Sequence, residues 1–314
     1  MAARTTAARY RNASEPRTDS SRRCWVIVPA TWHNALMARR SQLIPWRAAG
    51  RVSEDQTSAD DVVREIGWVF NNETGDSLDL EEFTGTGDQE IFAYLTAFDL
   101  LSADIGSQTL VEIGSGIGRM TAGFSKAFGH VIACDLDAAF LERCRQTVAK
   151  FGIVARLRTV HVADGRTLSV GDGEADLTFS YITLQHCDHD DALALVAEAV
   201  RVTKSGGHVA LNFRTWTGID VLLWPLGKLM RLAWRVPMIG PWLAKRRFAS
   251  RLGWQANRLS PDQVARHLDT LPDALAHRVI FHSPDRALAQ RSDAELRTFE
   301  GVNPSHWWLV AQRV

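Results

Sequence analysis

The feature that most constrains this chain is a short apolar run followed by three closely spaced glycines. Residues 109–113 are mostly apolar and are long enough for one buried parallel strand. The glycines then come at alternate positions: Gly114, Gly116 and Gly118. Apolar side chains next recur every four residues, as on one face of a helix: Met120, Phe124 and Phe128. Because a glycine turn before a helix start lets a ligand approach the backbone and its free N–H groups, this stretch predicts a nucleotide-like ligand.

Three acidic residues accompany the glycines at informative distances. Glu112 lies two residues before the first glycine. Asp135 ends the next apolar run, about 20 residues on, where a ribose-binding carboxylate is expected. Asp164 follows a third apolar run. A glycine pattern alone is shared by many nucleotide folds, so the acidic residues carry much of the interpretation.

Together these residues resemble the class I S-adenosylmethionine (SAM) dependent methyltransferases, whose first motif reads Glu-x-Gly-x-Gly-x-Gly. The resemblance covers roughly residues 83–214. It implies SAM as the cofactor, with the ribose held by Asp135 and the adenine amino group near Asp164. The cofactor residues implied are Glu112, Gly114, Ser115, Gly116, Gly118, Asp135, Leu136, Asp164, Gly165 and Ser180.

Two alternatives stay open beside this resemblance. A nicotinamide-dependent Rossmann oxidoreductase could use a similar glycine turn, although the glycine spacing and Asp164 favour SAM. A non-catalytic, methyltransferase-like binding module could keep the same cofactor residues without transferring a methyl group. Cofactor binding and turnover distinguish the three.

Strands and helices alternate through the middle of the chain. Strands are predicted over residues 109–113, 130–135, 157–162, 175–182 and 208–213, and helices over 119–128, 137–151 and 190–203. This alternation predicts an α/β fold with a doubly wound, mostly parallel sheet. Residues 277–282 and 307–312 read as the last two strands. The resemblance implies a Rossmann-like, seven-stranded sheet in the order 3-2-1-4-5-7-6.

The N-terminal third is expected to lie outside the sheet. Residues 1–24 carry six arginines and two acids, which is typical of a disordered tail and shared by some transit peptides. Helices are predicted over 31–40 and from about residue 58, the latter with Val62, Val63, Ile66 and Phe70 on one side. By resemblance, residues 25–108 form a helical cap and residues 109–314 the methyltransferase domain.

The glycine-containing stretch 83–88 has two interpretations. It resembles the family's short segment near the methionine end of SAM, or it is an ordinary glycine turn before a helix over 89–101.

The segment 180–186 occupies the family's fourth motif, at the strand edge where ligands bind. It lacks Asn-Pro-Pro-Tyr, and Cys187 is not preceded by proline, so the base-modifying patterns of the family are absent from the sequence. The resemblance therefore implies O-methylation of a small-molecule or lipid-like acceptor, not of nucleic acid. His186 is the candidate general base, since imidazole can accept a proton near neutral pH. The alternative role of His186 is to orient the loop.

An insertion is expected at residues 216–259, after the fifth strand. No acidic residue occurs between Asp220 and Asp262. The basic residues between them are Lys228, Arg231, Arg235, Lys245, Arg246, Arg247, Arg251 and Arg258. Tryptophans and leucines are interleaved with them, and three prolines predict short helices. The segment 220–262 reads as a hydrophobic lid, as a lid resting on an anionic membrane or lipid-linked substrate, or as an RNA surface.

Composition excludes several other classes. The formal net charge is zero, so the whole molecule has no general attraction to nucleic acid. The four cysteines have neither metal-site nor disulfide-framework spacing, so no metal centre is expected. No run of about 20 uncharged apolar residues occurs. We therefore expect a cytoplasmic protein with or without peripheral membrane contact.

Overall fold

The structure is a computed structural model. It describes residues 58–63, 78–234, 236, 238–244, 246–273, 275–282, 288–291 and 303–314. The predicted tail over 1–24, the predicted helix over 31–40 and the predicted apolar positions Ile66 and Phe70 lie outside these residues. Residues 59–63 are helical, and Val62 and Val63 are buried there.

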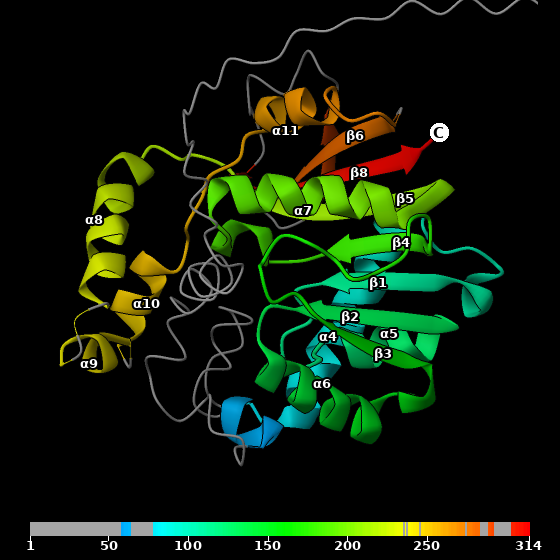
Figure 1. Ribbon diagram of the computed structural model, residues 1–314, viewed down its shortest axis with the longest axis horizontal. Helices are drawn as coiled ribbons and strands as arrows, with labels where there is room; N and C mark the ends of the chain where they lie inside the picture. The colour runs from blue at the N-terminus through cyan, green and yellow to red at the C-terminus, as the bar shows by residue number, and fades with distance from the viewer. Residues whose placement is uncertain are drawn as a thin grey trace, which may run out of the picture.

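An eight-stranded sheet forms the centre of the molecule (Figure 1). Its strands are β1 (Thr109–Ile113), β2 (His130–Asp135), β3 (Leu157–His161), β4 (Ala175–Ser180), β5 (Thr203–Arg214), β6 (Leu275–His282), β7 (Leu288–Arg291) and β8 (Asn303–Arg313). The order is β3-β2-β1-β4-β5-β8-β6-β7, with β1 to β5 parallel and the pairs β5–β8, β8–β6 and β6–β7 antiparallel. This confirms the predicted seven-strand order, to which β7 adds an unpredicted edge strand.

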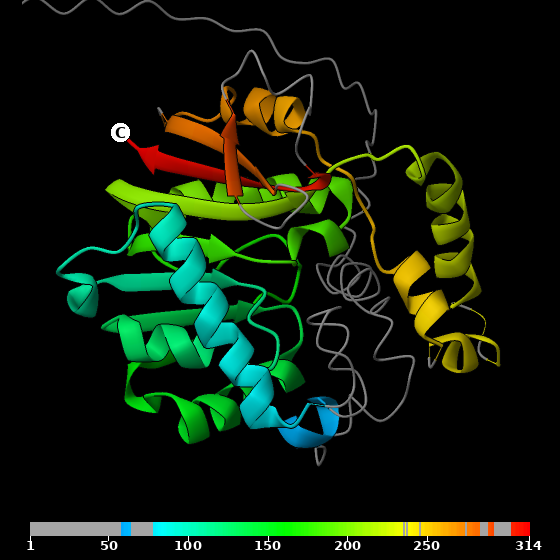
Figure 2. The same ribbon diagram turned by 180° about the vertical axis from the view of Figure 1, so that it is seen from behind.

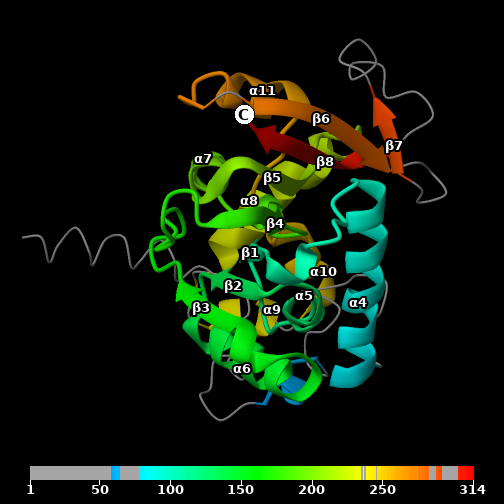
Figure 3. The same ribbon diagram turned by 90° about the vertical axis from the view of Figure 1, so that its right-hand side faces the viewer.

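Helices cover both faces of the sheet. The α-helices are α4 (Leu80–Ala97), α5 (Thr121–Ala127), α6 (Ala138–Phe151), α7 (His189–Val202), α8 (Asp220–Ala233), α9 (Gly240–Ala244), α10 (Arg247–Gly253) and α11 (Pro261–Leu268). The short 3₁₀ turns are η1 (Ile105–Ser107), η2 (Val154–Arg156) and η3 (Leu184–His186). Helices α4 and α5 lie on one face and α7 and α11 on the other, while α6 packs beside β2 and β3 (Figures 2 and 3).

Neighbouring tryptophans on β8 show how the two faces are filled. Successive side chains of a strand point to opposite faces. Trp307 accordingly packs in the cluster with α7 and α11, and Trp308 in the cluster with α4 and α5; both are fully buried. Because apolar layers cover both faces, the inner strands read as nearly continuous apolar runs rather than alternating ones.

Helix α4 corrects one prediction. A capping box starts it at Leu80: the Asp79 carboxylate accepts from the Glu82 N–H at 2.8 Å, and the Glu82 carboxylate accepts from the Asp79 N–H at 3.1 Å. The stretch 83–88 therefore lies inside a helix, and its interpretation as a glycine turn is wrong. Gly87 is needed for packing instead, since a Cβ there would collide with the backbone carbonyl of Arg119.

Strand β5 begins five residues before its predicted start at residue 208. Helix α7 ends at Val202 and β5 begins at once with Thr203. Gly206 therefore lies inside the strand, with a φ of +81°. The pairing of β4 with β5 shifts register between Ala175 and Leu177, so the glycine-containing stretch is accommodated as an irregularity in the ladder.

Helices α8, α9 and α10 form a separate unit at the sheet edge to which the β4 arrow points (Figure 1). Trp234, Leu243 and Ala249 make a small apolar core within it. Pro225 lies inside α8 without ending it, whereas Pro241 occupies the first turn of α9. In the part of the chain that the structure describes, no helix is long and apolar enough to cross a membrane.

Candidate functional site

The glycine loop lies between β1 and α5, and its backbone needs glycine. Gly114, Gly116 and Gly118 have φ values of +80°, +55° and +93°, in the left-handed region. The N–H groups of Gly114 and Ser115 both donate to the Cys134 carbonyl, at 2.7 and 3.1 Å, which fastens the loop to β2. A Cβ on Gly114 would collide with the side chain of Thr183. Conformation and close packing therefore both exclude larger residues.

Asp135, at the end of β2, lies directly beside this loop. Its two carboxylate oxygens each accept one backbone N–H, from Gly116 and from Asp137, both at 2.8 Å. A carboxylate oxygen has two lone pairs, so each keeps one acceptor site for a ligand hydroxyl. Burial raises the pKa of Asp135 to about 6, although both N–H bonds oppose that shift. The geometry suits bidentate binding of two vicinal hydroxyl groups.

Glu112 supplies a second, fully buried carboxyl group. Its oxygen accepts from the Thr121 hydroxyl at 2.6 Å. Burial raises the pKa of Glu112 to about 7, while the Thr121 bond and the charge of Arg119 lower it and the charge of Asp135 raises it. A cationic ligand would stabilise the ionised forms of both carboxylates. SAM carries a sulfonium and an ammonium group, so this pair of acids fits it.

Asp164 follows β3 and is exposed. Burial acts to raise its pKa, but the N–H groups of Arg166 and Thr167, both at 2.9 Å from one carboxylate oxygen, contribute to a combined hydrogen-bonding effect that lowers it overall. Gly165 has a φ of +71°, and a Cβ there would lie 3.7 Å from the Leu136 side chain. Leu136 and Gly165 are therefore neighbours, which brings the ends of β2 and β3 together.

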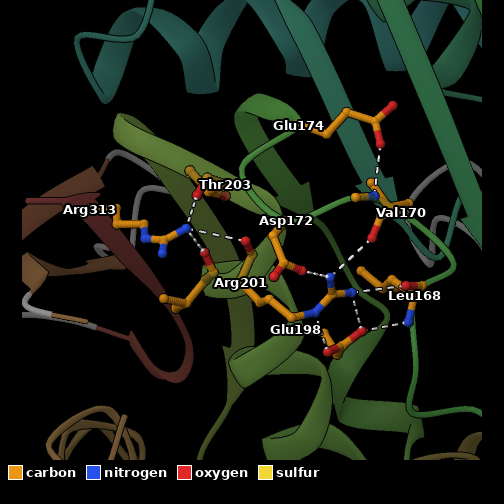
Figure 4. Close-up of polar contacts among 10 residues, drawn as sticks. Leu168, Val170, Asp172, Glu174, Glu198, Arg201, Thr203 and Arg313 are labelled. Atoms are coloured by element: carbon orange, nitrogen blue, oxygen red, sulfur yellow. Dashed lines mark hydrogen bonds and ion pairs between the residues drawn. The ribbon is translucent and has the colours of Figure 1, made fainter. Parts of the chain in front are cut away.

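Arg201 of α7 holds the loop that begins at Asp164 (Figure 4). Its guanidinium donates to the carbonyls of Leu168 and Val170, at 2.9 and 3.0 Å, and pairs with Glu198 and Asp172. Glu198 also accepts from the Leu168 N–H at 2.7 Å. Sequence reasoning assigned Arg201 no site role, because its carbonyl partners lie about 30 residues away in the chain.

Ser180 ends β4, and His186 follows in the short turn η3. The Ser180 hydroxyl is buried and donates to the Ile113 carbonyl at 2.9 Å, so it joins β4 to β1. His186 Nδ1 lies 3.0 Å from the Trp254 carbonyl. Because a carbonyl only accepts, Nδ1 carries the proton, and the lone pair of Nε2 accepts from the Gln185 amide at 3.3 Å. Burial lowers the pKa of His186 to about 4, and the charges of Arg258 and Arg214 lower it further, while the Trp254 bond opposes the shift.

The structure thus divides the predicted site residues into two groups. Glu112, the glycine loop, Asp135, Leu136 and Gly165 gather around the ends of β1, β2 and β3. His186 lies beyond β4, beside the segment that follows α10. Arg119 was not singled out from the sequence; it pairs with Glu90 at 2.7 Å and with the Thr86 hydroxyl at 3.2 Å, which fastens α4 to the glycine loop.

Known proteins resemble the chain over this region. A family model described as a methyltransferase domain matches residues 111–211. The ubiquinone/menaquinone biosynthesis C-methyltransferase of Vibrio cholerae is 27% identical over 211 residues, which cover 65% of this chain and 77% of that protein. Phosphoethanolamine N-methyltransferase 1 of Triticum aestivum is 30% identical over 107 residues, which cover 33% of this chain and only 21% of that protein.

Among solved structures, magnesium protoporphyrin IX methyltransferase from Synechocystis PCC 6803, with bound SAH, superposes with a TM-score of 0.48 and 14% identity, covering 81% of this chain and 98% of that one. The segment matched by the family model runs from β1 into β5 and contains the glycine loop, Asp135 and Asp164. The family-model match therefore identifies residues 111–211 as a methyltransferase domain, and the motifs in it are those of the class I, SAM-dependent type.

Proposed function

We propose that this protein transfers the methyl group of SAM to an oxygen atom of a small, lipid-like acceptor that it meets at a membrane surface. The observation that carries this proposal is the apolar outer face of α8 beside the carboxyl ends of the parallel strands. Two relatives are named for ubiquinone and menaquinone biosynthesis and for phosphoethanolamine, which supports a lipid-related acceptor.

The ends of β1, β2 and β3 would hold the cofactor. Asp135 accepts the two ribose hydroxyls, Glu112 faces the ammonium group, and Asp164 meets the adenine amino group. Bound SAM supplies a methyl group on a positively charged sulfur. The chain contributes by fixing the acceptor oxygen in line with that methyl group, since alignment alone can account for a large part of such a rate increase.

His186 is the proposed general base. Its Nε2 is the atom that would take the proton of the acceptor hydroxyl, which must first displace the Gln185 amide from it; the low pKa keeps Nε2 unprotonated at neutral pH. We expect His186→Ala to lower the transfer rate by about 10²- to 10⁴-fold while SAM affinity stays unchanged. The wild-type rate should be level above about pH 5 and fall as the pH approaches 4. A small loss that does not vary with pH would instead give His186 the role of orienting the loop.

The outer face of α8 supports the membrane part of the proposal. Its exposed apolar side chains recur at helical spacing: Val221, Leu222, Leu226, Leu229 and Leu232. Lys228 lies 3.4 Å from the centre of the Trp224 ring, and Arg246 lies 4.9 Å from that of Trp242. Apolar side chains flanked only by basic and aromatic ones are typical of helices that lie in the membrane interface.

Calorimetry and mass spectrometry together test the proposed function. The protein should bind SAM and not NAD, and with SAM it should add 14 daltons to a compound of a total lipid extract. A mass increment found only in the water-soluble fraction would contradict a lipid-like acceptor. Binding of SAM without turnover on either fraction would favour the non-catalytic alternative, and binding of NAD the oxidoreductase.

A further inference from the structure

A cluster of cationic side chains lies where β5 and β8 meet at the carboxyl edge of the sheet. Arg214 ends β5, and His306 is its direct partner on β8. Directly paired residues of antiparallel strands point to the same face, so these side chains are neighbours. Arg258 reaches the cluster from the segment between α10 and α11, and Asp220 reaches it from the first turn of α8.

Asp220 is the carboxylate that pairs with both arginines, and its acceptor sites are filled. One of its oxygens accepts from Arg258 Nε and Nη2 at 3.1 and 2.9 Å and from Arg214 Nη2 at 3.3 Å. Its other oxygen accepts from the Thr217 N–H and hydroxyl at 2.9 and 2.8 Å. A carboxylate offers about four lone-pair sites. A single carboxylate thus faces two guanidinium groups, and one positive charge is left over.

The surplus charge belongs to Arg214. The remaining Nη1 of Arg258 donates to the Asn257 carbonyl at 2.8 Å. By contrast, the one ion pair of the Arg214 guanidinium with a described residue is that with Asp220 at 3.3 Å, although its side chain is just 13% exposed. A buried charge so weakly paired is unfavourable. Burial and the charge of Arg258 lower the pKa of Arg214 to about 10.

The surroundings of His306 show the same excess of positive charge. Burial lowers the pKa of His306 to about 3, and the charges of Arg214, His282, His186 and Arg258 lower it further. His306 is therefore neutral at physiological pH and can donate an N–H to an anion. A bound anion would compensate the excess positive charge at this edge of the sheet.

The position of the cluster fits the acceptor rather than the cofactor. Strand β5 is separated from β1 by β4 alone. Neighbouring strands lie about 4.8 Å apart, so Arg214 lies roughly 10 Å across the sheet edge from the glycine loop. His186 lies near both arginines and follows β4, the strand between β1 and β5. A molecule of modest size can reach from one to the other.

We infer that Arg214 and His306 bind an anionic group of the methyl acceptor, either a carboxylate or a phosphate, and that Asp220 and Arg258 hold Arg214 in place. The inference rests on the proposed function for the identity of the ligand, but its electrostatics do not depend on it. It adds a charged group to the lipid-like acceptor proposed above.

Calorimetric titration with inorganic phosphate and with acetate, at constant ionic strength, tests the inference. We expect wild-type protein to bind at least one of these anions, and Arg214→Gln to weaken that binding at least 10-fold. Asp220→Asn keeps an oxygen that can accept from Arg214 but removes the negative charge that competes with the anion, so it should strengthen anion binding. SAM affinity should be unchanged in both variants. Arg145→Gln is the matched control, because Arg145 lies on α6 and pairs with Glu142 at the surface.

The opposite signs expected for the two variants separate binding from a purely structural role. Equal anion affinity in wild type and Arg214→Gln, or weaker anion binding in Asp220→Asn, would contradict the inference. The cluster would then have only the structural role of joining α8 to the sheet. If Arg214→Gln does not fold, His306→Gln should still weaken anion binding several-fold, and an unchanged affinity there overturns the inference. Failure of the wild type to bind SAM would refute the proposed function but would not change the conclusion about anion binding. The anion that binds more tightly, phosphate or acetate, identifies the charged group of the acceptor.

Discussion

At the scale of single residues, Asp135 is oriented before any ligand arrives, because two backbone N–H groups from different segments hold its oxygens. Asp135→Ala removes the charged acceptor that we propose for the two ribose hydroxyls, and it should weaken SAM binding by about 1.5–3 kcal/mol, or roughly 10- to 150-fold. Glu142→Ala is the control, since that carboxylate is 58% exposed and pairs with Arg145 on the surface of α6. Calorimetry that finds equal affinity for wild type and Asp135→Ala would remove Asp135 from the cofactor site.

Glu112 makes the stability of the ligand-free protein depend on pH. Its pKa is about 7 in the folded protein against 4.5 for an ordinary glutamate, so the folded state holds the proton more tightly than the unfolded state. This contribution to stability is complete below about pH 4.5 and is lost as the pH rises to 7, by at most about 1.4 kcal/mol per pH unit. Asp135, with a pKa of about 6, acts in the same direction.

Glu112→Gln should therefore flatten the fall in the free energy of unfolding between pH 5 and 7. Urea unfolding of both proteins at pH 5, 6 and 7 measures the difference between their free energies of unfolding. The other titrating groups contribute equally to both proteins, so their effect cancels in this difference. Parallel curves for wild type and variant would mean that Glu112 is ionised throughout that range.

That Asp135 lies beside the glycine loop could be predicted from the sequence, because its distance from the glycines is a local property. The long-range contacts could not. The pKa of His186 depends on burial beside Trp254, 68 residues away in the chain, and the sequence carries no signal for that contact. The surplus charge on Arg214 likewise follows from a carboxylate shared with Arg258, 44 residues further on, and from a strand partner near the C-terminus.

At the scale of elements, the outer face of α8 predicts binding to anionic vesicles. Each basic residue near such a surface contributes about 1 kcal/mol, and the effect weakens with salt. Leu222→Gln combined with Leu229→Gln should reduce co-sedimentation with phosphatidylserine vesicles, since both side chains are more than 60% exposed. Phe92→Gln, on the exposed side of α4, is the control for loss of a surface apolar group.

The charged flank of the same unit should act differently. Lys228→Gln combined with Arg246→Gln removes electrostatic attraction but keeps the apolar stripe, so it should weaken binding to anionic vesicles and leave binding to neutral ones unchanged. Equal sedimentation of the wild type with neutral and anionic vesicles, or none with either, would make α8–α10 a plain substrate lid.

Elements with a long periodic pattern were predictable, and those decided by competing local signals were not. Helices α6 and α7 begin and end within a residue or two of their predicted bounds, because their apolar faces extend over several turns. Helix α4 begins nine residues before its predicted start, since the Asp79–Glu82 capping box outweighs the two glycines that follow. Strand β7 has four residues and pairs only with β6, too short a run for any periodicity.

At the scale of the whole molecule, the sheet and the α8–α10 unit have separate apolar cores. The chain passes between them twice, after β5 and before α11, and the Asp220–Arg258 pair joins the two crossings. Asn257 belongs to the sheet side, because its amide donates to the carbonyls of Leu184 and Cys187. The α8–α10 unit can therefore be removed from the chain without disrupting the apolar cores of the sheet.

Replacing residues 221–253 with a short Gly-Ser linker removes α8, α9 and α10 but keeps Asp220, Asn257 and Arg258. Since the glycine loop, Glu112 and Asp135 rest on β1, β2 and α5, we expect the shortened protein to fold cooperatively and to bind SAM with wild-type affinity. It should no longer sediment with anionic vesicles, and methylation of a lipid-like acceptor should fall far more than SAM binding does. A shortened protein that is folded but has lost SAM binding would show instead that α8–α10 forms part of the cofactor site, and retained vesicle binding would place the membrane contact elsewhere on the chain.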